Sequence, residues 1–220
     1  QNTSSNVVKM PHTADLPDWF EVKKGRMEIS YYYLAQHVLA KYPAMSDAME
    51  FVIYNPKLGY WTRNVETFLN RVVSNEFLKK ERKNNMIKEV ENSILAQVTA
   101  DETKQLPRPV VGKVALKNGV YDMKTGEFEK NGFRPEYYLR TAHDIEYDEN
   151  ATCEAFDKFL MYINDNDEGK VLFVYEWLGS LFWTDMRAKF MQKILFVYGN
   201  GGSGKSVITQ VARALVGEAA

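Results

Sequence analysis

The sequence of 220 residues contains one cysteine, three histidines and no long apolar run. A single cysteine, Cys153, cannot form a disulfide within the chain, which excludes the disulfide-stapled secreted class and favours a reducing intracellular setting. It cannot complete a zinc cluster with histidines as scattered as His12, His37 and His143. The longest apolar stretches, "ILFVY" and "VLFVYEWLGSLFW", are too short for a spanning helix of roughly 20 residues or carry a charge. We therefore expect a cytoplasmic protein without a membrane partner or a protein-held metal cluster.

The chain also lacks a charge excess, since 28 basic residues face 29 acidic residues for a net charge of -1. This balance neither indicates nor excludes nucleic acid, because such binding depends on local patches. Hydrophobic residues make up 45% of the sequence, enough for a sizeable core. Composition therefore predicts a globular protein and leaves its substrate open.

The first half of the sequence predicts a tail followed by helices and one hairpin. Residues 1–21 are polar, contain two prolines and lack periodicity, which is typical of a linker. Apolar periodicity predicts a helix over 31–42 with Ser30 as its cap, and helices over 65–78 and 82–99. Between them, "MEFVIYNPKLGYWTRN" predicts a hairpin whose longer turn contains Asn55, Pro56 and Gly59.

The second half predicts a change of architecture. Short apolar runs around Asn118-Gly119 and Thr125-Gly126 predict a small antiparallel sheet within 110–130, with positive backbone angles at the Asn-Gly pair. Apolar spacing then predicts helices over 153–163 and within 168–183, and an apolar strand over 193–198. The expected class is α/β: a mainly helical accessory domain over 22–187 with a small antiparallel sheet, then the first strand, loop and helix of a parallel-sheet domain over 188–220.

Residues 199–206, "GNGGSGKS", fit the phosphate-loop pattern G-x-x-x-x-G-K-[ST]. Glycines allow successive amides to converge on phosphate oxygens, and the helix predicted next favours an anion through its dipole. Lys205 would reach the β- and γ-phosphates of ATP, and Ser206 would bind Mg²⁺. The predicted nucleotide-binding residues are Gly199, Gly201, Gly202, Ser203, Gly204, Lys205 and Ser206.

Other patterns have simpler explanations. A glycine-rich turn can be only a turn, although the flanking strand and helix patterns favour phosphate binding. "KKERK" at 79–83, with Arg71 and Lys88, could contact DNA phosphates, but such a charge run is usually a solvated face. Aromatic residues such as those of "YYY" at 31–33 could stack on bases, but their spacing favours core packing. The acidic residues of 144–149 lack the spacing of a calcium loop.

Four blocks in order, "VALKNGVYDMKTGEFE", "YDENATCEAFDKFL", "EWLGSLF" and "ILFVYGNGGSGKS", make residues 110–217 resemble the helicase region of phage, plasmid and poxvirus-type primase-helicases. Such proteins are superfamily 3 helicases of the AAA+ class. The resemblance implies a hexameric homo-oligomer that hydrolyses ATP with Mg²⁺ and translocates on single-stranded DNA during replication. It also implies an upstream primase or polymerase domain and a location in the host cytoplasm.

The resemblance assigns Lys205 a catalytic role in ATP hydrolysis. It places the acidic Walker B pair, the sensor and the arginine finger beyond Ala220, so this chain alone is expected to bind nucleotide weakly and not to turn it over. The alternative is a non-catalytic module for oligomerisation or DNA docking. Translocation direction, ring size and the DNA-contacting residues do not follow from the sequence.

Overall fold

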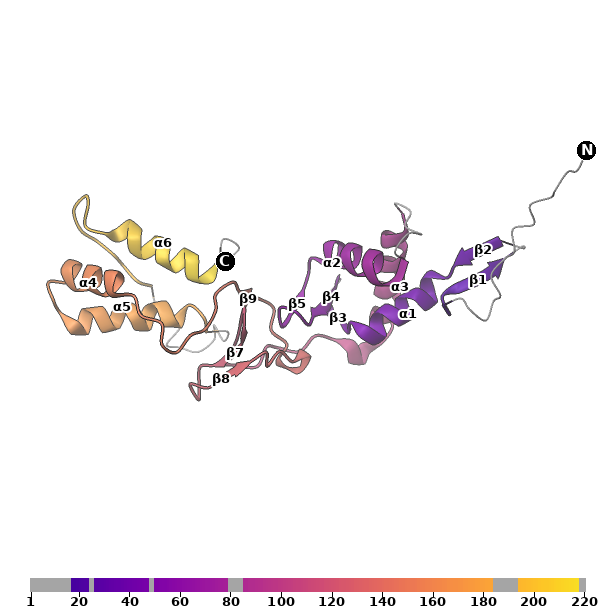
Figure 1. The fold of residues 1–220 in the computed structure, drawn as a ribbon, viewed down its shortest axis with the longest axis horizontal. Coiled ribbons are helices and arrows are strands. Elements are labelled where there is room, and N and C mark those ends of the chain that lie inside the picture. The colour runs from indigo at the N-terminus through magenta and orange to yellow at the C-terminus, as the bar shows by residue number, and fades with distance from the viewer. Residues whose placement is uncertain (1–16, 24–25, 48–49, 79–84, 184–193, 218–220) are drawn as a thin grey trace, which may run out of the picture. The chain divides into compact units, whose positions relative to one another are not determined.

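The computed structural model describes residues 17–23, 26–47, 50–78, 85–183 and 194–217 (Figure 1). Contacts divide the chain into one unit of residues 1–53 and 63–105 and a second unit of residues 54–62 and 106–220. The fold is mixed α/β with small sheets, as predicted. The expected domain boundary near residue 188 and the run at 79–83 both lie outside the described residues.

The first unit begins with a hairpin, where a linker was predicted. β1 (Phe20–Lys23) pairs antiparallel with β2 (Arg26–Ile29), so the last residues of the expected tail are part of a strand. The indole ring of Trp19 meets the ring of His37 edge-on, with 4.9 Å between centroids, and Phe77 at 5.6 Å. The predicted tail of residues 1–21 is therefore wrong for its last residues, which begin β1. Trp19 packs against His37 and Phe77, and its polar sequence neighbours do not indicate this packing.

Three helices form the core of this unit. α1 (Tyr31–Lys41) follows Ser30, as predicted, although the Ser30 side chain makes no capping bond. α3 (Met86–Thr99) packs against α1 and against α2 (Val65–Val72) (Figure 1). Leu34, Leu69 and Ile94 have no exposed surface in this core.

The helix predicted over 65–78 is present, but its second half, Val73–Leu78, is π-helical. Val73 and Leu78 are both buried in the core. Residues five apart lie about 140° apart around an α-helix, so they cannot both face one core in α geometry. The wider π turn brings both side chains inward. Sequence periodicity, which assumes the α spacing, could not predict this.

The predicted hairpin belongs to a three-stranded sheet. β3 (Ala44–Asp47), β4 (Glu50–Asn55) and β5 (Tyr60–Thr62) are adjacent in that order. The amide of Gly59 donates to the carbonyl of Asn55 at 2.9 Å, and Gly59 has φ +73°. The hairpin prediction is confirmed, including the need for glycine in its turn.

The second unit contains a four-stranded sheet in the order β8-β7-β6-β9. β6 (Lys113–Leu116), β7 (Gly119–Asp122) and β8 (Phe128–Lys130) are antiparallel, as predicted, and β9 (Ala142–His143) adds a parallel edge to β6. The turn between β6 and β7 is Lys117-Asn118, because Leu116 pairs with Gly119. Neither residue of the Asn-Gly pair has positive φ, so that prediction is wrong.

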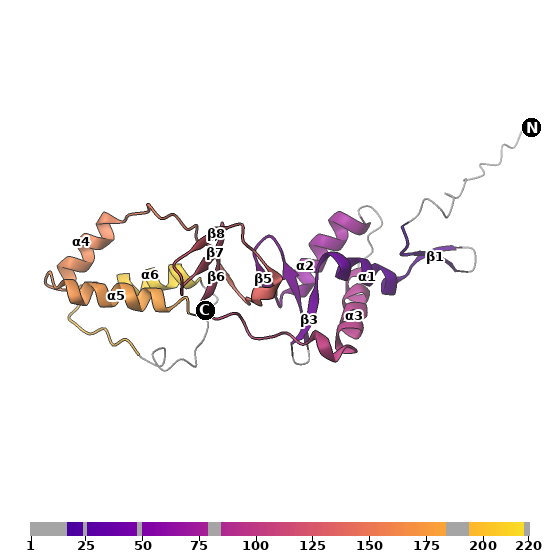
Figure 2. The same cartoon turned by 90° about the horizontal axis from the view of Figure 1, so that it is seen from below.

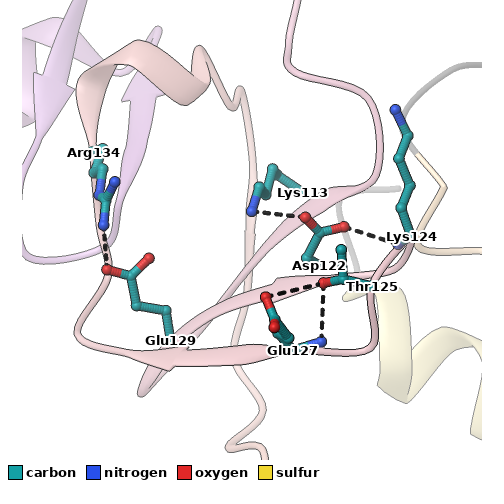
Figure 3. Close-up of polar contacts among 7 residues, drawn as sticks. All are labelled: Lys113, Asp122, Lys124, Thr125, Glu127, Glu129 and Arg134. Atoms are coloured by element: carbon teal, nitrogen blue, oxygen red, sulfur yellow. Dashed lines mark hydrogen bonds and ion pairs between the residues drawn. The ribbon is translucent and has the colours of Figure 1, made fainter.

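Polar contacts hold one end of this sheet (Figure 3). Lys113 and Asp122 are cross-strand partners whose Nζ and Oδ2 atoms lie 2.8 Å apart. The amide of Lys124 donates to Oδ1 of Asp122 at 2.8 Å (Figure 3). The bond from Lys113 and the amide donors hold the pKa of Asp122 below its usual value. Arg134 pairs with Glu129 beside β8 (Figure 3).

Three further helices pack together around one apolar cluster (Figure 2). They are α4 (Glu154–Ile163), α5 (Glu168–Ser180) and α6 (Lys205–Val216). All three were predicted, although α5 ends at Ser180 and turns follow to Phe182. Leu160 is fully buried in the cluster, and Phe156 of α4 and Val211 and Leu215 of α6 pack against its buried residues.

Candidate functional site

The glycine-rich segment 199–204 forms a loop that leads directly into α6. Gly202 and Gly204 have φ +81° and +80°, a left-handed conformation that side chains disfavour. Gly204 precedes the first helical residue, Lys205, so it sets the direction in which the helix leaves the loop. Gly204 occupies a fixed glycine position of the motif, whereas Gly202 occupies a variable one, and both supply left-handed backbone to the turn.

The start of α6 presents a group of unsatisfied amides. Within the described part of the chain, the backbone N–H groups of Gly202, Gly204, Lys205 and Ser206 have no hydrogen-bond acceptor. The first N–H groups of any helix lack partners inside it, and the helix dipole places partial positive charge beside them. The site can therefore accept a phosphate group with several oxygens.

The ammonium group of Lys205 is held by its own loop. Its Nζ donates to the carbonyl of Gly199 at 2.8 Å, to that of Asn200 at 2.8 Å and to Oγ of Ser203 at 2.9 Å. These three acceptors match the three protons that an ammonium carries. The lysine therefore lies over the loop, with uncharged oxygens as its described hydrogen-bond acceptors.

The remaining predicted residues belong to the same loop and first helical turn. Gly201 and Ser206 are exposed to solvent, and the hydroxyl of Ser206 is accessible on the first turn of α6. A serine hydroxyl is a suitable oxygen ligand for Mg²⁺ alongside phosphate oxygens. The seven predicted residues, Gly199 and 201–206, are neighbours in sequence and occupy this loop and the first turn of α6, and their binding of nucleotide stays a prediction.

The predicted strand before the loop is absent. Of residues 193–198, the structure describes 194–198, and none of these is in a strand. Leu195 is of intermediate exposure, and the other four side chains are exposed, up to 94% for Tyr198. A strand requires a neighbour for its backbone hydrogen bonds, and no described strand pairs with this segment. The sequence shows β propensity here, but propensity alone does not supply that neighbour.

One feature of the site could not be found from the motif. The ring of Phe159 and the side chain of Ile163, both on α4, lie against the backbone of Gly204. The apolar spacing over 153–163 predicted that Phe159 would lie on the apolar face of the helix, but not which part of the chain would pack against it. The same ring lines a mainly apolar groove of about 780 Å³ between α4, α5 and α6.

The other candidates are structural in the described residues. No group of three or more histidine, cysteine, aspartate or glutamate residues in the described ranges could hold a metal ion. Asp144 is 93% exposed and lies 3.6 Å from Lys117. The ring of His143 packs edge-on against Phe182, and burial lowers the pKa of this histidine. The guanidinium of Arg71 lies 5.4 Å from the ring of Phe68.

Comparison with known proteins places most of this structure in one family. The family described as "D5 N terminal like" matches residues 18–163, which is more than half of the chain. The chain belongs to this family. In the structure, the match extends from the hairpin β1-β2 to the last residue of α4. The phosphate-loop motif lies beyond the match, so family membership does not itself assign a role to Lys205.

A viral protein shares part of the sequence. "Putative helicase 121R" of Invertebrate iridescent virus 3 is 29% identical over 119 residues, which cover 48% of this chain. The matched region is 11% of the length of that viral protein. Among the described helices of the present chain, none is long and apolar enough to cross a membrane.

Proposed function

We propose that this chain is part of an ATP-dependent DNA helicase of the superfamily 3 type that acts in replication. Membership of the D5 N terminal like family and the viral relative named as a helicase support a protein of the primase-helicase kind. The phosphate-loop motif at residues 199–206 supports ATP as the fuel.

One observation carries the proposal: in the described structure, four amides of the loop and first turn of α6 have no hydrogen-bond acceptor, and the Lys205 ammonium group of the same loop bonds only uncharged oxygens. Glycines whose conformation a side chain would disfavour maintain this arrangement. Together they form a cradle for the β- and γ-phosphates of a nucleotide, in which the amides bind phosphate oxygens and Lys205 adds a full positive charge.

Each predicted residue has one task in this proposal. Gly199, Gly201, Gly202 and Gly204 let the backbone curve around the phosphates, and Ser203 holds Lys205 until nucleotide enters. Lys205 then moves its bonds to the phosphates and stabilises charge during hydrolysis. The Ser206 hydroxyl would hold Mg²⁺, which supplies neutralisation of the phosphate charge when bound.

Phosphoryl transfer needs further groups, namely an acid that helps hold Mg²⁺ or positions water and an arginine. The proposal places both beyond Ala220, the arginine on a neighbouring subunit of a hexameric ring. Single-stranded DNA is the proposed track, and an upstream primase or polymerase domain is the proposed partner on the same polypeptide. These assignments follow from the resemblance to primase-helicases.

A second function, as a module for assembly, has its own observation. Leu172 and Phe173 on α5 are 58% and 54% exposed. Exposed apolar side chains of this size favour contact with another protein surface. If this were the whole function, nucleotide would be irrelevant, and substitution of Lys205 would leave oligomer formation and replication unchanged.

The deciding experiment is DNA-stimulated ATP hydrolysis by the full-length protein and its Lys205→Ala variant. We expect a loss of roughly 10²-fold or more in hydrolysis, because a positioned charge is removed from the transferred phosphate. Lys170→Ala, on exposed surface of α5, is the matched control and should hydrolyse ATP like the wild type. Equal hydrolysis by Lys205→Ala and wild type would end the helicase assignment.

A further inference from the structure

We propose that Phe159 of α4 is a positioning residue for the phosphate loop: its ring is the support on which Gly204, and therefore the first turn of α6, is held. This inference rests on the proposed nucleotide-binding function of that loop. It concerns a residue that lies outside the motif, inside the part of the chain that matches the D5 N terminal like family.

The contact is direct. A methyl group placed on the α-carbon of Gly204 would lie 2.6 Å from Cζ and 2.8 Å from Cε2 of the Phe159 ring, and 3.3 Å from Cγ2 of Ile163. Separations below 3.0 Å essentially never occur for real β-carbons, so the ring occupies the space that a side chain at Gly204 would need. Ring and backbone are therefore packed without a gap.

Gly204 is the place where another element of the fold reaches the loop. A methyl group on Gly201 or Gly202 would meet nothing within 4 Å, and one on Gly199 would meet only Ser203 of the same loop. Other contacts come from inside the loop. The amide of Ser203 donates a hydrogen bond to the carbonyl of Asn200, and the ammonium group of Lys205 donates to the hydroxyl of Ser203. At the glycines of the loop, the described contact from another element of the fold thus comes from α4.

The ring of Phe159 is itself fixed. It stacks on Phe156 one turn earlier, with 6.1 Å between centroids and 21° between the ring planes. Phe156 in turn meets the ring of Tyr175 on α5 edge-on at 6.0 Å. The hydroxyl of Tyr175 donates to Asp157 of α4. A chain of aromatic contacts therefore connects α5 through α4 to the phosphate loop.

This support has a consequence for binding. A loop that is ordered before the phosphate arrives loses less conformational entropy on binding than one that must be ordered by the ligand. Removal of the ring leaves Gly204 next to a space that joins the apolar groove. We expect the affinity of the full-length protein for ATP with Mg²⁺ to fall roughly 3- to 10-fold in Phe159→Ala, while the motif itself stays intact.

The experiment compares wild type with Phe159→Ala, Phe159→Leu and Tyr162→Ala in the full-length protein. Tyr162 is on the same helix but 83% exposed, so Tyr162→Ala controls for loss of an aromatic ring from α4. The first measurement is amide hydrogen exchange, without nucleotide, of the peptide spanning 199–211, which contains the hydrogen-bonded amides of Ser203, Val207 and Ile208. The second is the Kd for ATP with Mg²⁺, with far-UV circular dichroism as the check of helix content.

We expect faster exchange of the loop and weaker nucleotide binding in Phe159→Ala, partial restoration of both in Phe159→Leu, and no change in Tyr162→Ala. If Phe159→Ala loses helix content, the comparison of Phe159→Leu with wild type decides whether the ring holds the loop, because leucine keeps most of the apolar volume. Wild-type exchange of the loop in a folded Phe159 variant would overturn the proposal. Faster exchange with an unchanged Kd would also overturn it, since the support would then not serve binding.

The two proposals can fail separately. If the wild type binds no nucleotide, the proposed function is wrong, and the Kd measurement cannot support positioning for phosphate. The exchange measurement needs no nucleotide, so it still decides whether Phe159 holds the loop. If Lys205→Ala abolishes binding while the Phe159 variants bind like wild type, the function stands and the positioning role is wrong.

Discussion

Asn118 and the backbone of Tyr147 exchange two hydrogen bonds across 29 positions of sequence. The Nδ2 atom of Asn118 donates to the Tyr147 carbonyl at 2.9 Å, and the Tyr147 amide donates to Oδ1 of Asn118 at 3.0 Å. The ring of Tyr147 packs on Phe128 with centroids 4.6 Å apart, and on Tyr121 at 5.2 Å. Asn118, in the turn after β6, thus connects the segment around Tyr147 to the sheet through these two hydrogen bonds.

Asn118→Ala should therefore destabilise the protein by about 1–3 kcal/mol, because both backbone groups of Tyr147 lose partners in a partly buried site. The free energy of unfolding in urea measures the effect. Asn150→Ala is the control, since Asn150 is exposed and its side chain makes no hydrogen bond within the described structure. Equal stabilities of the two variants would show that the turn does not fasten this segment.

Asp122→Asn should remove an acid-dependent part of the stability. The pKa of Asp122 is held below its usual value by Lys113 and by backbone amides, so the folded state favours the charged carboxylate. Its contribution is present above the unfolded-state pKa of about 3.9 and is lost as the pH falls through the lower folded-state pKa.

The wild type should accordingly be more stable than Asp122→Asn at pH 7, and the difference should shrink below about pH 4. Unfolding free energies measured between pH 7 and pH 2 test this. Asp144→Asn, at a side chain that is 93% exposed, should show little difference at any pH. A constant gap for Asp122→Asn across the range would contradict the assignment.

Two glycines should respond in opposite directions to alanine. Gly204→Ala forces a side chain into a left-handed position with φ +80° and against the Phe159 ring, so it should destabilise by at least about 1–2 kcal/mol. Gly179→Ala, within α5 and with open space around the new methyl group, should stabilise by about 0.5–1 kcal/mol. Thermal unfolding of both variants measures these changes in stability. An unchanged stability of Gly204→Ala would mean that α4 moves away from residue 204 at little cost.

Local patterns in the sequence predicted the elements whose structure is decided locally. Apolar spacing placed α1, α2, α3 and α4, since one apolar face must be buried for a helix to be stable. The turn residues around Gly59 and Gly126 predicted their hairpins, and Gly126 has φ +77°. The fixed spacing of the motif placed Gly204, Lys205 and Ser206 at the start of a helix.

The features that the sequence did not predict share one cause: each depends on residues that are distant in the sequence. Asn118 lies in the predicted turn, but its side chain also bonds the backbone of the distant Tyr147, which the turn pattern does not encode. Residues 194–198 have the composition of a strand, yet no described strand lies beside them. The support of Gly204 by Phe159 joins residues 45 positions apart in sequence, and no periodic pattern encodes such a pairing.

The central claim is that the loop of residues 199–206 binds nucleotide through its amides and Lys205. Equilibrium titration of the full-length protein with a fluorescent ATP analogue and Mg²⁺ tests it most directly. We predict saturable binding by the wild type and by Lys170→Ala, competition by unlabelled ATP, and affinity at least about 10-fold weaker in Lys205→Ala, which corresponds to about 1.4 kcal/mol. Absence of binding by the wild type, or equal affinity in Lys205→Ala, would contradict the account.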